Sequence, residues 1–399
     1  MFRRVYLDNS ATTPADPRVI DAMMPYLMER FGNASSIHYF GQETRAAVDK
    51  ARHLVAGLIN ARPNEIIFTS GGTEANNLAI RGLLEAQSPP TDIRSHIITS
   101  VIEHPAVRNV CEDLEKHGYE VTYLPVYDDG LVRFEDVEAA VKENTVLISI
   151  MMANNEIGTL QPVEEIGRLV KRLRSAGQKI WFHTDAVQAA GKIPLDVEAV
   201  ACDLLSMSAH KLYAPKGIGA LYTRRGVRLH PQNIGGRQER SRRGGTEPVA
   251  NIVAYGKASE MAAEALGDEP ERLRRLRDSL EQAALERIEG AIVNGHADRR
   301  LPNISNISFC SIEGEGLLIN LDMQGIAVST GSACSSGSLE PSPVIRALGR
   351  DDELARGAIR FSFGRFNTDE DVERVLDVLP QAIDTLRSLS PRARKLAAK

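Results

Sequence analysis

Short apolar runs alternate with amphipathic segments through the first half of the chain. EIIFTS (65–70) and HIITS (96–100) are apolar runs, and each is followed by a segment with helical spacing, TEANNLAIRGLL and HPAVRNVCEDLEKHG. Apolar positions of the second helical segment share one face: Val107, Val110, Cys111 and Leu114. This pattern predicts β-strands that alternate with α-helices.

The same alternation continues to about residue 224. YEVTYLPV precedes FEDVEAAVKEN, TVLISIMM precedes VEEIGRLVKRLRSAG, and further apolar runs stand at 179–186, 203–209 and 218–224. Strands that alternate with helices form a mostly parallel sheet covered on both faces, so we predict an α/β fold. In such sheets the ligand binds beyond the carboxyl ends of the strands. The residues at these ends are therefore the candidates for chemistry.

The pattern changes after about residue 258. ERLRRLRDSLEQAALERI predicts a long amphipathic helix, and NISNISFCSI, IAVST and GAIRFSFGRF predict short strands. We therefore expect a large domain over residues 14–257 and a smaller α+β domain built from residues 1–13 and 258–399. The apolar stripe of the long helix consists of Leu273, Leu276, Leu280, Ala284 and Ile288.

The composition is that of an ordinary globular protein. Of 399 residues, 43% are hydrophobic and 25% are charged, and 48 basic against 53 acidic residues give a net charge of −5. A chain with this charge is poorly suited to hold nucleic acid. The basic cluster at 237–243 departs from this balance, and on its own it is best interpreted as a solvated loop.

Sequence features of secreted, membrane and metal-binding proteins are missing. The first residues, MFRRVYLDNS, lack the apolar run of a signal peptide, and no apolar stretch is long enough to cross a bilayer. The four cysteines form no CxxC pair, so we expect neither a disulfide framework nor a metal site. We therefore expect a cytoplasmic protein that contacts no membrane. The cysteines are Cys111, Cys202, Cys310 and Cys334.

A glycine pair stands where the first predicted strand gives way to a helix. In TSGGTEANN, Gly71, Gly72 and Thr73 lie at the predicted helix start, where backbone N–H groups and a hydroxyl form an anion site. An ordinary strand-to-helix turn uses the same residues. On this segment alone, the simpler interpretation is favoured.

Two further strand ends carry ionisable residues. Asp185 in FHTDAVQAAG, followed by Gln188, is either a helix N-cap or a charge partner for a cationic group. In SMSAHKLYAPKG, Ser208 and His210 alternate with apolar residues, so by strand periodicity they share a face. Lys211 follows directly. Burial there would lower its pKa toward use in a Schiff base, whereas a lysine that reaches the surface is the commoner case.

Taken together, these strand ends favour one kind of chemistry. An amine that can form a Schiff base, a carboxylate for a ring nitrogen and a phosphate cradle are what pyridoxal phosphate requires. Asp185 would keep the pyridine ring protonated, so that the ring can accept the electrons of a broken Cα bond. His104, in SVIEHPAV, begins a helix after another strand, and it either lies on the ring or has a purely structural role.

The chain resembles the cysteine desulfurases in a long series of motifs. In order, these are YLDNSATTP, FGNASSIH, FTSGGTEANN, EHPAV, NNEIGTLQP, HTDAVQAAGK, SAHKLYAPKGIGALY, RRGGTEPV and GSACSSGSLEPS. The resemblance runs from about Tyr6 to about Pro391 and is closest to the nitrogen-fixation and iron–sulfur-cluster type. It implies the fold type I architecture of class V aminotransferases, a homodimer, pyridoxal phosphate as the cofactor, and removal of sulfur from L-cysteine to give L-alanine.

The resemblance implies roles for residues around the cofactor ring. Lys211 would form the Schiff base, and His104 would stack on the ring and act as acid–base for the substrate thiol. Asp185 would pair with the ring nitrogen, and Gln188 would hydrogen-bond the phenolic oxygen.

The phosphate has an implied site between two subunits. Gly72, Thr73, Ser208 and His210 would hold it from one subunit, and Thr246 would reach it from the other.

The substrate carboxylate has an implied site as well. Asn155 and Arg360 would bind it, Arg360 through a bidentate pair, and Asn155 would also border the cofactor. Asn33 would assist, although Ala34 stands where many relatives have proline.

Cys334 stands in the segment STGSACSSGS (329–338), among glycine and small hydroxyl residues that cannot pack a buried thiol. The resemblance implies that Cys334 accepts the sulfur as a persulfide on a mobile loop at about 329–340. The sulfur would then pass to an acceptor or scaffold protein for iron–sulfur clusters, and Cys334 could transiently ligate a cluster. The other three cysteines are expected in or near the core.

Alternatives to this function stay open. A selenocysteine lyase would carry the same residues, whereas another class V enzyme such as a transaminase has no need of Cys334. A non-catalytic scaffold subunit would be expected to have lost Lys211, Asp185 or Cys334, and all three are present.

Overall fold

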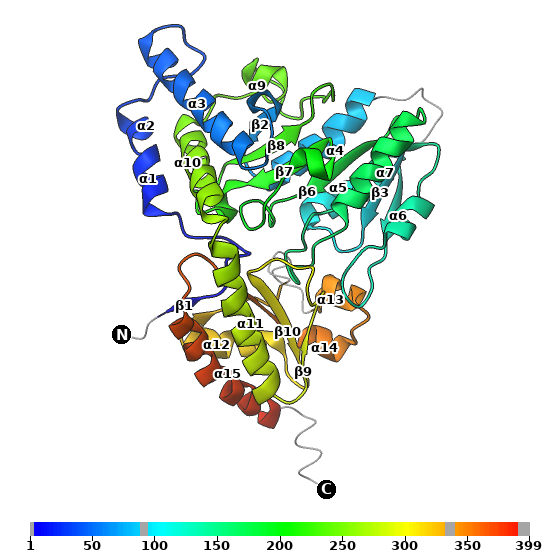
Figure 1. The fold of residues 1–399 in the computed structure, drawn as a ribbon, viewed down its shortest axis with the longest axis vertical. Coiled ribbons are helices and arrows are strands. Elements are labelled where there is room, and N and C mark those ends of the chain that lie inside the picture. Colours follow the sequence, from blue (N-terminus) through cyan, green and yellow to red (C-terminus); the bar gives the residue numbers. More distant parts are fainter. Residues whose placement is uncertain (1–3, 88–94, 332–339, 390–399) are drawn as a thin grey trace.

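The computed structural model describes residues 4–87, 95–331 and 340–389, which form two lobes (Figure 1). The upper lobe in this view contains a seven-stranded sheet, and the lower lobe contains two small sheets. Cys334 lies outside the described residues.

The sheet of the upper lobe is mostly parallel. Its strands are, in spatial order, β2 (Ile66–Thr69), β8 (Gly219–Thr223), β7 (Leu204–Ser208), β6 (Trp181–Asp185), β5 (Thr145–Ser149), β3 (His96–Ser100) and β4 (Glu120–Leu124). Of these seven strands, β8 runs in the direction opposite to the other six. The α/β fold predicted from the alternating pattern is confirmed.

Helices cover both faces of this sheet. The longer ones are α3 (Tyr39–Gly57), α4 (Gly72–Gln87), α5 (Pro105–Lys116), α7 (Val163–Ser175) and α10 (Val249–Ala265). Neighbouring residues of a strand point to opposite faces. Ile67 and Ile97 accordingly pack with α4 and α5, whereas Ile66 and Ile98 belong to the core that includes α3, α7 and α10. Short helices complete the lobe: α1 (Pro17–Met23), α2 (Pro25–Met28), α6 (Phe134–Ala139), α8 (Val197–Val200) and α9 (Gln238–Ser241).

The lower lobe has its own core. Its elements are the antiparallel sheet β12 (Ala358–Ser362), β10 (Ile304–Phe309) and β9 (Ala291–Val293), the parallel pair β1 (Val5–Tyr6) and β11 (Ile326–Ala327), and the helices α11 (Glu269–Arg287), α12 (Gly314–Met323), α13 (Pro343–Ala347), α14 (Asp352–Arg356) and α15 (Asp369–Leu389). The apolar stripe predicted for α11 is buried in this core, from Leu273 to Ile288.

The N-terminal segment joins the two lobes. Leu7 belongs to the core of the lower lobe, and the N–H of Ser10 donates to Oγ of Ser362 on β12 (2.9 Å). A few residues later, the N–H of Thr13 donates to the carbonyl of His210 in the upper lobe (3.1 Å). The first residues of the chain therefore lie against two segments that follow much later in the sequence.

One local expectation is wrong. β7 ends at Ser208, and Ala209–Lys211 forms a 3-10 turn, so His210 does not share a strand face with Ser208. The chain leaves the strand here because it must turn back to enter the antiparallel strand β8. The domain limits at 13/14 and 257/258 stay a prediction, and α10 runs across the second of them.

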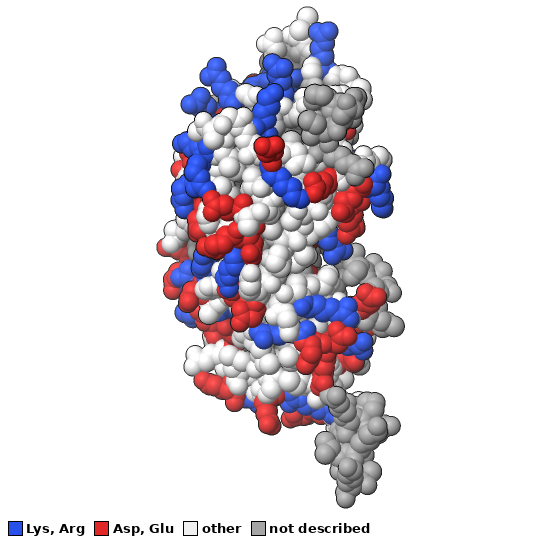
Figure 2. Space-filling model, turned by 90° about the vertical axis from the view of Figure 1, so that its right-hand side faces the viewer, with Lys and Arg blue, Asp and Glu red and all other residues white. Residues whose placement is uncertain are grey.

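The basic cluster at 237–243 is held by ion pairs. Glu239, inside the cluster, forms a buried pair with Arg52 of α3 (2.7 Å), and Arg243 pairs with Glu74 of α4 (2.9 Å). These contacts fix the loop against the upper lobe. On the face shown in Figure 2, acidic and basic side chains are interspersed.

Two features are absent from the described ranges. None of the helices in residues 4–87, 95–331 and 340–389 combines the length and hydropathy that a bilayer crossing requires. The same ranges hold no group of three or more His, Cys, Asp or Glu side chains placed to bind a metal ion.

Candidate active site

A cavity of about 340 Å³ opens where the parallel strands of the large sheet end. The rule for parallel sheets predicted a site at this edge. Most of the candidate residues line the cavity: Gly72, Thr73, His104, Asn155, Asp185, Gln188, Ser208, His210, Lys211 and Arg360.

The start of α4 forms one wall of the cavity. A Cβ on Gly72 would lie 2.8 Å from Cγ2 of Val187, so a larger residue would force Val187 or the helix start to shift. Thr73 and Ser208 place two hydroxyl groups on the same wall. Backbone N–H groups at a helix start, together with hydroxyl groups, suit an anion such as a phosphate.

Asp185, the last residue of β6, is buried against the cavity. One carboxylate oxygen accepts a hydrogen bond from Nδ2 of Asn76 (2.7 Å), and the other accepts from the N–H of Val187 (2.9 Å). The carboxylate thus caps a turn, since no helix begins here, and the helix N-cap interpretation is wrong. It also borders the cavity, and its role as a charge partner stays a prediction. Its position suits a cationic group on the ligand.

Lys211 is buried, and its side chain does not reach the surface. Its Nζ donates to the main-chain carbonyls of Ser10 (2.5 Å) and Ala11 (2.6 Å) beside the cavity. The amine is therefore held in place by the segment that joins the two lobes.

His104 has the structural role considered for it and also borders the cavity, while its place on a cofactor ring stays a prediction. Its Nδ1 accepts from the N–H of Ala106 (3.1 Å) and so caps α5, while the ring lines the cavity. Because Nδ1 accepts this bond, the neutral ring carries its proton on Nε2. Burial lowers the pKa of His104. The nearby carboxylate of Asp185 acts in the opposite direction, and Lys211 lowers the pKa further.

His210 lies close to the same wall as Ser208. Its Nδ1 is 3.1 Å from Oγ1 of Thr12. Burial, Lys211 and Lys216 together lower the pKa of His210 to about 4. The imidazole is therefore neutral at pH 7 and can donate one N–H to a ligand.

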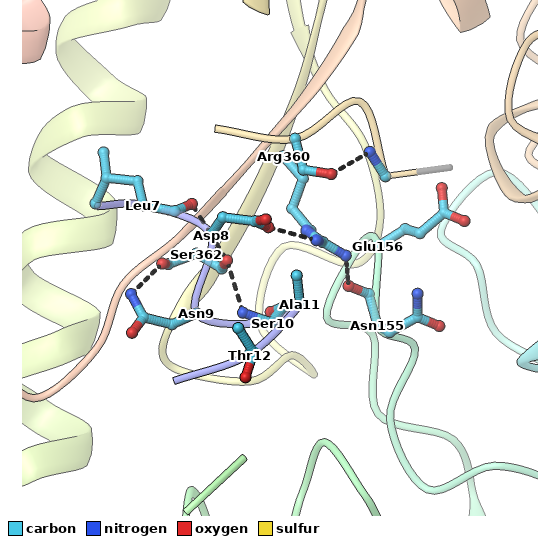
Figure 3. Close-up of polar contacts among 12 residues, drawn as sticks. Leu7, Asp8, Asn9, Ser10, Ala11, Thr12, Asn155, Glu156, Arg360 and Ser362 are labelled. Atoms are coloured by element: carbon cyan, nitrogen blue, oxygen red, sulfur yellow. Dashed lines mark hydrogen bonds and ion pairs between the residues drawn. The ribbon is translucent and has the colours of Figure 1, made fainter. Parts of the chain in front are cut away.

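Arg360 enters the cavity from β12 of the lower lobe (Figure 3). Its Nη2 donates to Asp8 Oδ1 (2.7 Å), and its Nη1 donates to the carbonyl of Asn155 (2.9 Å). Its Nε is buried and has no hydrogen-bond partner among the described residues. The guanidinium group is thus oriented by the protein and keeps a donor for a ligand carboxylate.

Two of the described candidate residues do not line this cavity, and a further candidate cannot be placed. Asn33 and Thr246 are exposed on the surface, and Asn33 Oδ1 accepts a hydrogen bond from the N–H of Ser35 (2.9 Å). The third, Cys334, falls in the part of the sequence that the structure does not describe.

Some cavity residues were not predicted from the sequence. Ser10 and Ala11 contribute through main-chain carbonyls, for which no side-chain signature exists. Asn76 follows Gly72 by four residues, so it lies one helical turn away on the same face of α4, and this spacing could have identified it. Asp8 stands in the motif YLDNSATTP beside these residues, but only the fold brings it to Arg360.

The residues present fit pyridoxal phosphate. The cavity offers a buried amine on Lys211, a carboxylate on Asp185, and a glycine-walled anion site at the start of α4. Oγ of Ser10 and Oδ1 of Asn76 are buried at the cavity without a hydrogen-bond partner in the described ranges. Such orphaned polar atoms are rare in native proteins and are consistent with a site that a ligand completes.

Comparison with known proteins gives consistent matches. The family model described as aminotransferase class-V matches residues 5–375. A cysteine desulfurase IscS from Dictyoglomus turgidum is 51% identical over 391 residues, which cover 98% of this chain and 97% of the relative. A cysteine desulfurase IscS from Methanosarcina thermophila is 50% identical over 389 residues, which cover 98% of this chain and 94% of the relative.

Comparison with solved structures points to the same family of proteins. A NifS-like protein superimposes with a TM-score of 0.89 at 38% identity, covering 96% of this chain and 100% of the other. A NifS-like protein from Rickettsia africae superimposes with a TM-score of 0.84 at 30% identity, with coverage of 96% and 100%. The two-lobed architecture is therefore that of the fold type I enzymes.

Proposed function

Since this chain belongs to the class-V aminotransferase family and is a cysteine desulfurase, we propose that its cavity takes sulfur from L-cysteine, releases L-alanine and passes the sulfur to Cys334. Pyridoxal phosphate is the cofactor of this enzyme. The observation that carries the proposal is the seating of Lys211, whose buried amine borders the same cavity as Asp185 and Arg360.

When bound, pyridoxal phosphate supplies a ring that accepts the electron pair of a breaking bond at the substrate Cα. We assign Lys211 to its aldehyde, Asp185 to its ring nitrogen, His104 to its ring face and Gln188 to its phenolic oxygen. Gln188 is buried, and its Nε2 donates to the carbonyl of Ser10 (3.0 Å), which supports a fixed orientation of this side chain.

The phosphate is assigned to the wall at the start of α4. Gly72, Thr73, Ser208 and His210 would hold it with N–H, hydroxyl and imidazole groups of this chain. Thr246 is assigned to the phosphate of a second copy, in keeping with its exposed position.

Arg360 and Asn155 are assigned to the carboxylate of L-cysteine. The contacts of Arg360 to Asp8 and to the carbonyl of Asn155 orient its guanidinium, and its partnerless Nε supports a role in binding an acid. Asn33 of a second copy would assist.

Two groups of this chain would move protons. Lys211 Nζ takes the proton from the substrate Cα and later returns a proton to carbon. His104, whose pKa is lowered by burial, exchanges a proton with the substrate sulfur through Nε2.

Sulfur transfer is assigned to Cys334. Its thiolate attacks the substrate sulfur, so that an S–S bond forms and the C–S bond breaks. The electron pair of the C–S bond goes to the substrate, whose Cβ takes a proton and becomes the methyl group of alanine. Cys334 is left as a persulfide, from which the sulfur would pass to an acceptor or an iron–sulfur scaffold protein.

The proposal predicts matched products. The purified enzyme with L-cysteine and dithiothreitol should form L-alanine and sulfide in equal amounts, because each turnover frees one sulfur and one amino acid. Amino-acid analysis and a colorimetric sulfide assay measure the two. Sulfide accompanied by pyruvate and ammonia in place of alanine would contradict the proposal.

A homodimer is supported by an exposed apolar surface on the upper lobe. Exposed side chains gather between α2 and the start of α3: Leu27 (55%), Met28 (63%), Phe31 (67%), Ile37 (90%) and Tyr39 (74%). Apolar clusters of this kind mark interaction sites. Asn33 lies within this stretch but does not line the cavity of its own chain, which supports a second copy of the chain as the partner that covers this surface.

The dimer can be tested by sedimentation velocity. The wild-type enzyme should sediment at twice the chain mass of 43.7 kDa, and Phe31→Asp with Ile37→Asp should shift it toward a single chain, because buried carboxylates disfavour the contact. Met323→Asp, at an equally exposed apolar position (82%) on α12, should leave the mass unchanged. A wild-type monomer at micromolar concentration would contradict the proposal.

The compartment is proposed to be the cytoplasm. Cys111, Cys202 and Cys310 are all free thiols, which supports a reducing environment.

A further inference from the structure

Lys192 is a buried lysine that the proposed reaction does not use. It lies in the turn after β6, its exposed fraction is 6%, and it does not line the cavity. Burial lowers the pKa of Lys192 to about 8, with Glu269 raising it and Arg365 lowering it. A buried ammonium costs several kcal/mol unless it is well paired, so its contacts indicate what it does.

The ammonium of Lys192 contacts the catalytic lysine through the main chain. Its Nζ donates to the carbonyl oxygen of Lys211 (3.1 Å) and stands 5.5 Å from the ring centre of Tyr213, within the range of a cation–π contact. A charged donor makes a stronger hydrogen bond than a neutral one. Lys192 thus holds the carbonyl of the residue whose side chain enters the cavity.

The turn that carries Lys211 is fixed on its other side as well. Oγ1 of Thr13 donates to the carbonyl of His210 (2.9 Å) and accepts from the N–H of Tyr213 (2.9 Å). Tyr213 has φ +65°, a left-handed conformation that a non-glycine residue adopts only under restraint. The bond from Lys192 therefore restrains the carbonyl of Lys211 between two residues that Thr13 holds, His210 and Tyr213.

We propose that Lys192 is a positioning residue that fixes the main chain of Lys211, so that the Lys211 amine is presented to the cofactor aldehyde. The inference rests on the proposed role of Lys211. Since displacement of a reacting group by about 1 Å can cost on the order of 10²-fold in rate, loss of this bond should be measurable in the chemistry of Lys211 itself.

The test follows covalent capture of the cofactor by the apoenzyme. Pyridoxal phosphate is mixed with apoenzyme, and the visible absorbance of the lysine-bound cofactor is followed in time. Lys192→Met keeps the length of the side chain and removes its donor. We expect capture about 10- to 100-fold slower than in the wild type, with unchanged far-ultraviolet circular dichroism.

Control variants separate positioning from packing. Leu195→Ala removes buried apolar volume from the same turn without touching Lys211, and it should lower the melting temperature but leave the capture rate unchanged. A folded Lys192→Met enzyme with wild-type capture, or equal slowing in Leu195→Ala, overturns the inference. If Lys192→Met does not fold, Lys192→Arg is the deciding variant, because it keeps the charge and the hydrogen-bond donor. Capture within about threefold of the wild-type rate then supports the positioning role. Slower capture in the folded Lys192→Arg enzyme overturns the inference.

Failure of the proposed function would look different. Wild-type apoenzyme that forms no covalent adduct, or Lys211→Ala apoenzyme that still forms it, would remove the role of Lys211. A normal adduct at Lys211 with no effect of Lys192→Met would remove only the role of Lys192.

Discussion

Lys211→Ala is expected to lower alanine formation from L-cysteine by at least about 10³-fold. The variant loses the group that would move the proton at the substrate Cα, and a positioned acid–base group alone accounts for factors of 10²–10⁴. It also loses the covalent attachment of the cofactor. The carbonyls of Ser10 and Ala11, which face the amine at 2.5 and 2.6 Å, would be left without this donor.

The measurement uses single turnovers, with alanine quantified by mass spectrometry and the visible spectrum recorded in parallel. Lys216→Ala is the matched control, since Lys216 is exposed, lies in the same loop and does not line the cavity. It should keep both rate and spectrum. A Lys211→Ala enzyme that forms alanine within tenfold of the wild-type rate would show that another base removes the proton from the substrate Cα.

Cys334→Ser is expected to lower sulfide release by about 10²-fold or more, while L-cysteine still changes the absorbance of the bound cofactor. A serine hydroxyl is a far weaker nucleophile toward sulfur than a thiolate. Binding of L-cysteine relies on Arg360 and Lys211, which remain. The variant should thus separate substrate binding from sulfur transfer.

The remaining cysteines provide the controls for this experiment. None of Cys111, Cys202 and Cys310 lines the cavity, and burial raises the pKa of the Cys111 thiol to about 12. Cys310 is the most accessible of the three, so Cys310→Ser is the matched variant and should release sulfide at the wild-type rate. If Cys310→Ser loses sulfide release and Cys334→Ser keeps it, the sulfur acceptor is wrongly assigned.

The parallel strands could be predicted because they are buried on both faces and therefore read as unbroken apolar runs. Ile97 and Ile98 illustrate this, since each packs against a different layer of helices. The direction of β8 was not foreseen, because its sequence resembles that of its parallel neighbours. The short connection from Ser208 to Gly219 could have indicated that β8 is antiparallel, since a parallel crossover needs a dozen or more residues.

The predicted cavity residues share one property. Residues such as Asp185 and Lys211 stand at or just after strand ends, where parallel topology brings distant segments together. Ser10 and Ala11 act through main-chain carbonyls, which look alike in every residue. Asp8 meets Arg360 across 352 positions of sequence, a pairing that follows from the completed fold and not from local pattern.

The long reach of the N-terminal segment has a consequence for biosynthesis. The carbonyls of Ser10 and Ala11, which accept hydrogen bonds from the Lys211 amine, are fixed only after Ser10 has bonded to Ser362 and Asp8 has bonded to Arg360. At about 5–20 residues per second, a ribosome needs roughly 20–70 s to supply that last strand after the first residues emerge. We therefore expect a nascent chain to fold its large sheet first and to become able to load its cofactor only near the end of translation.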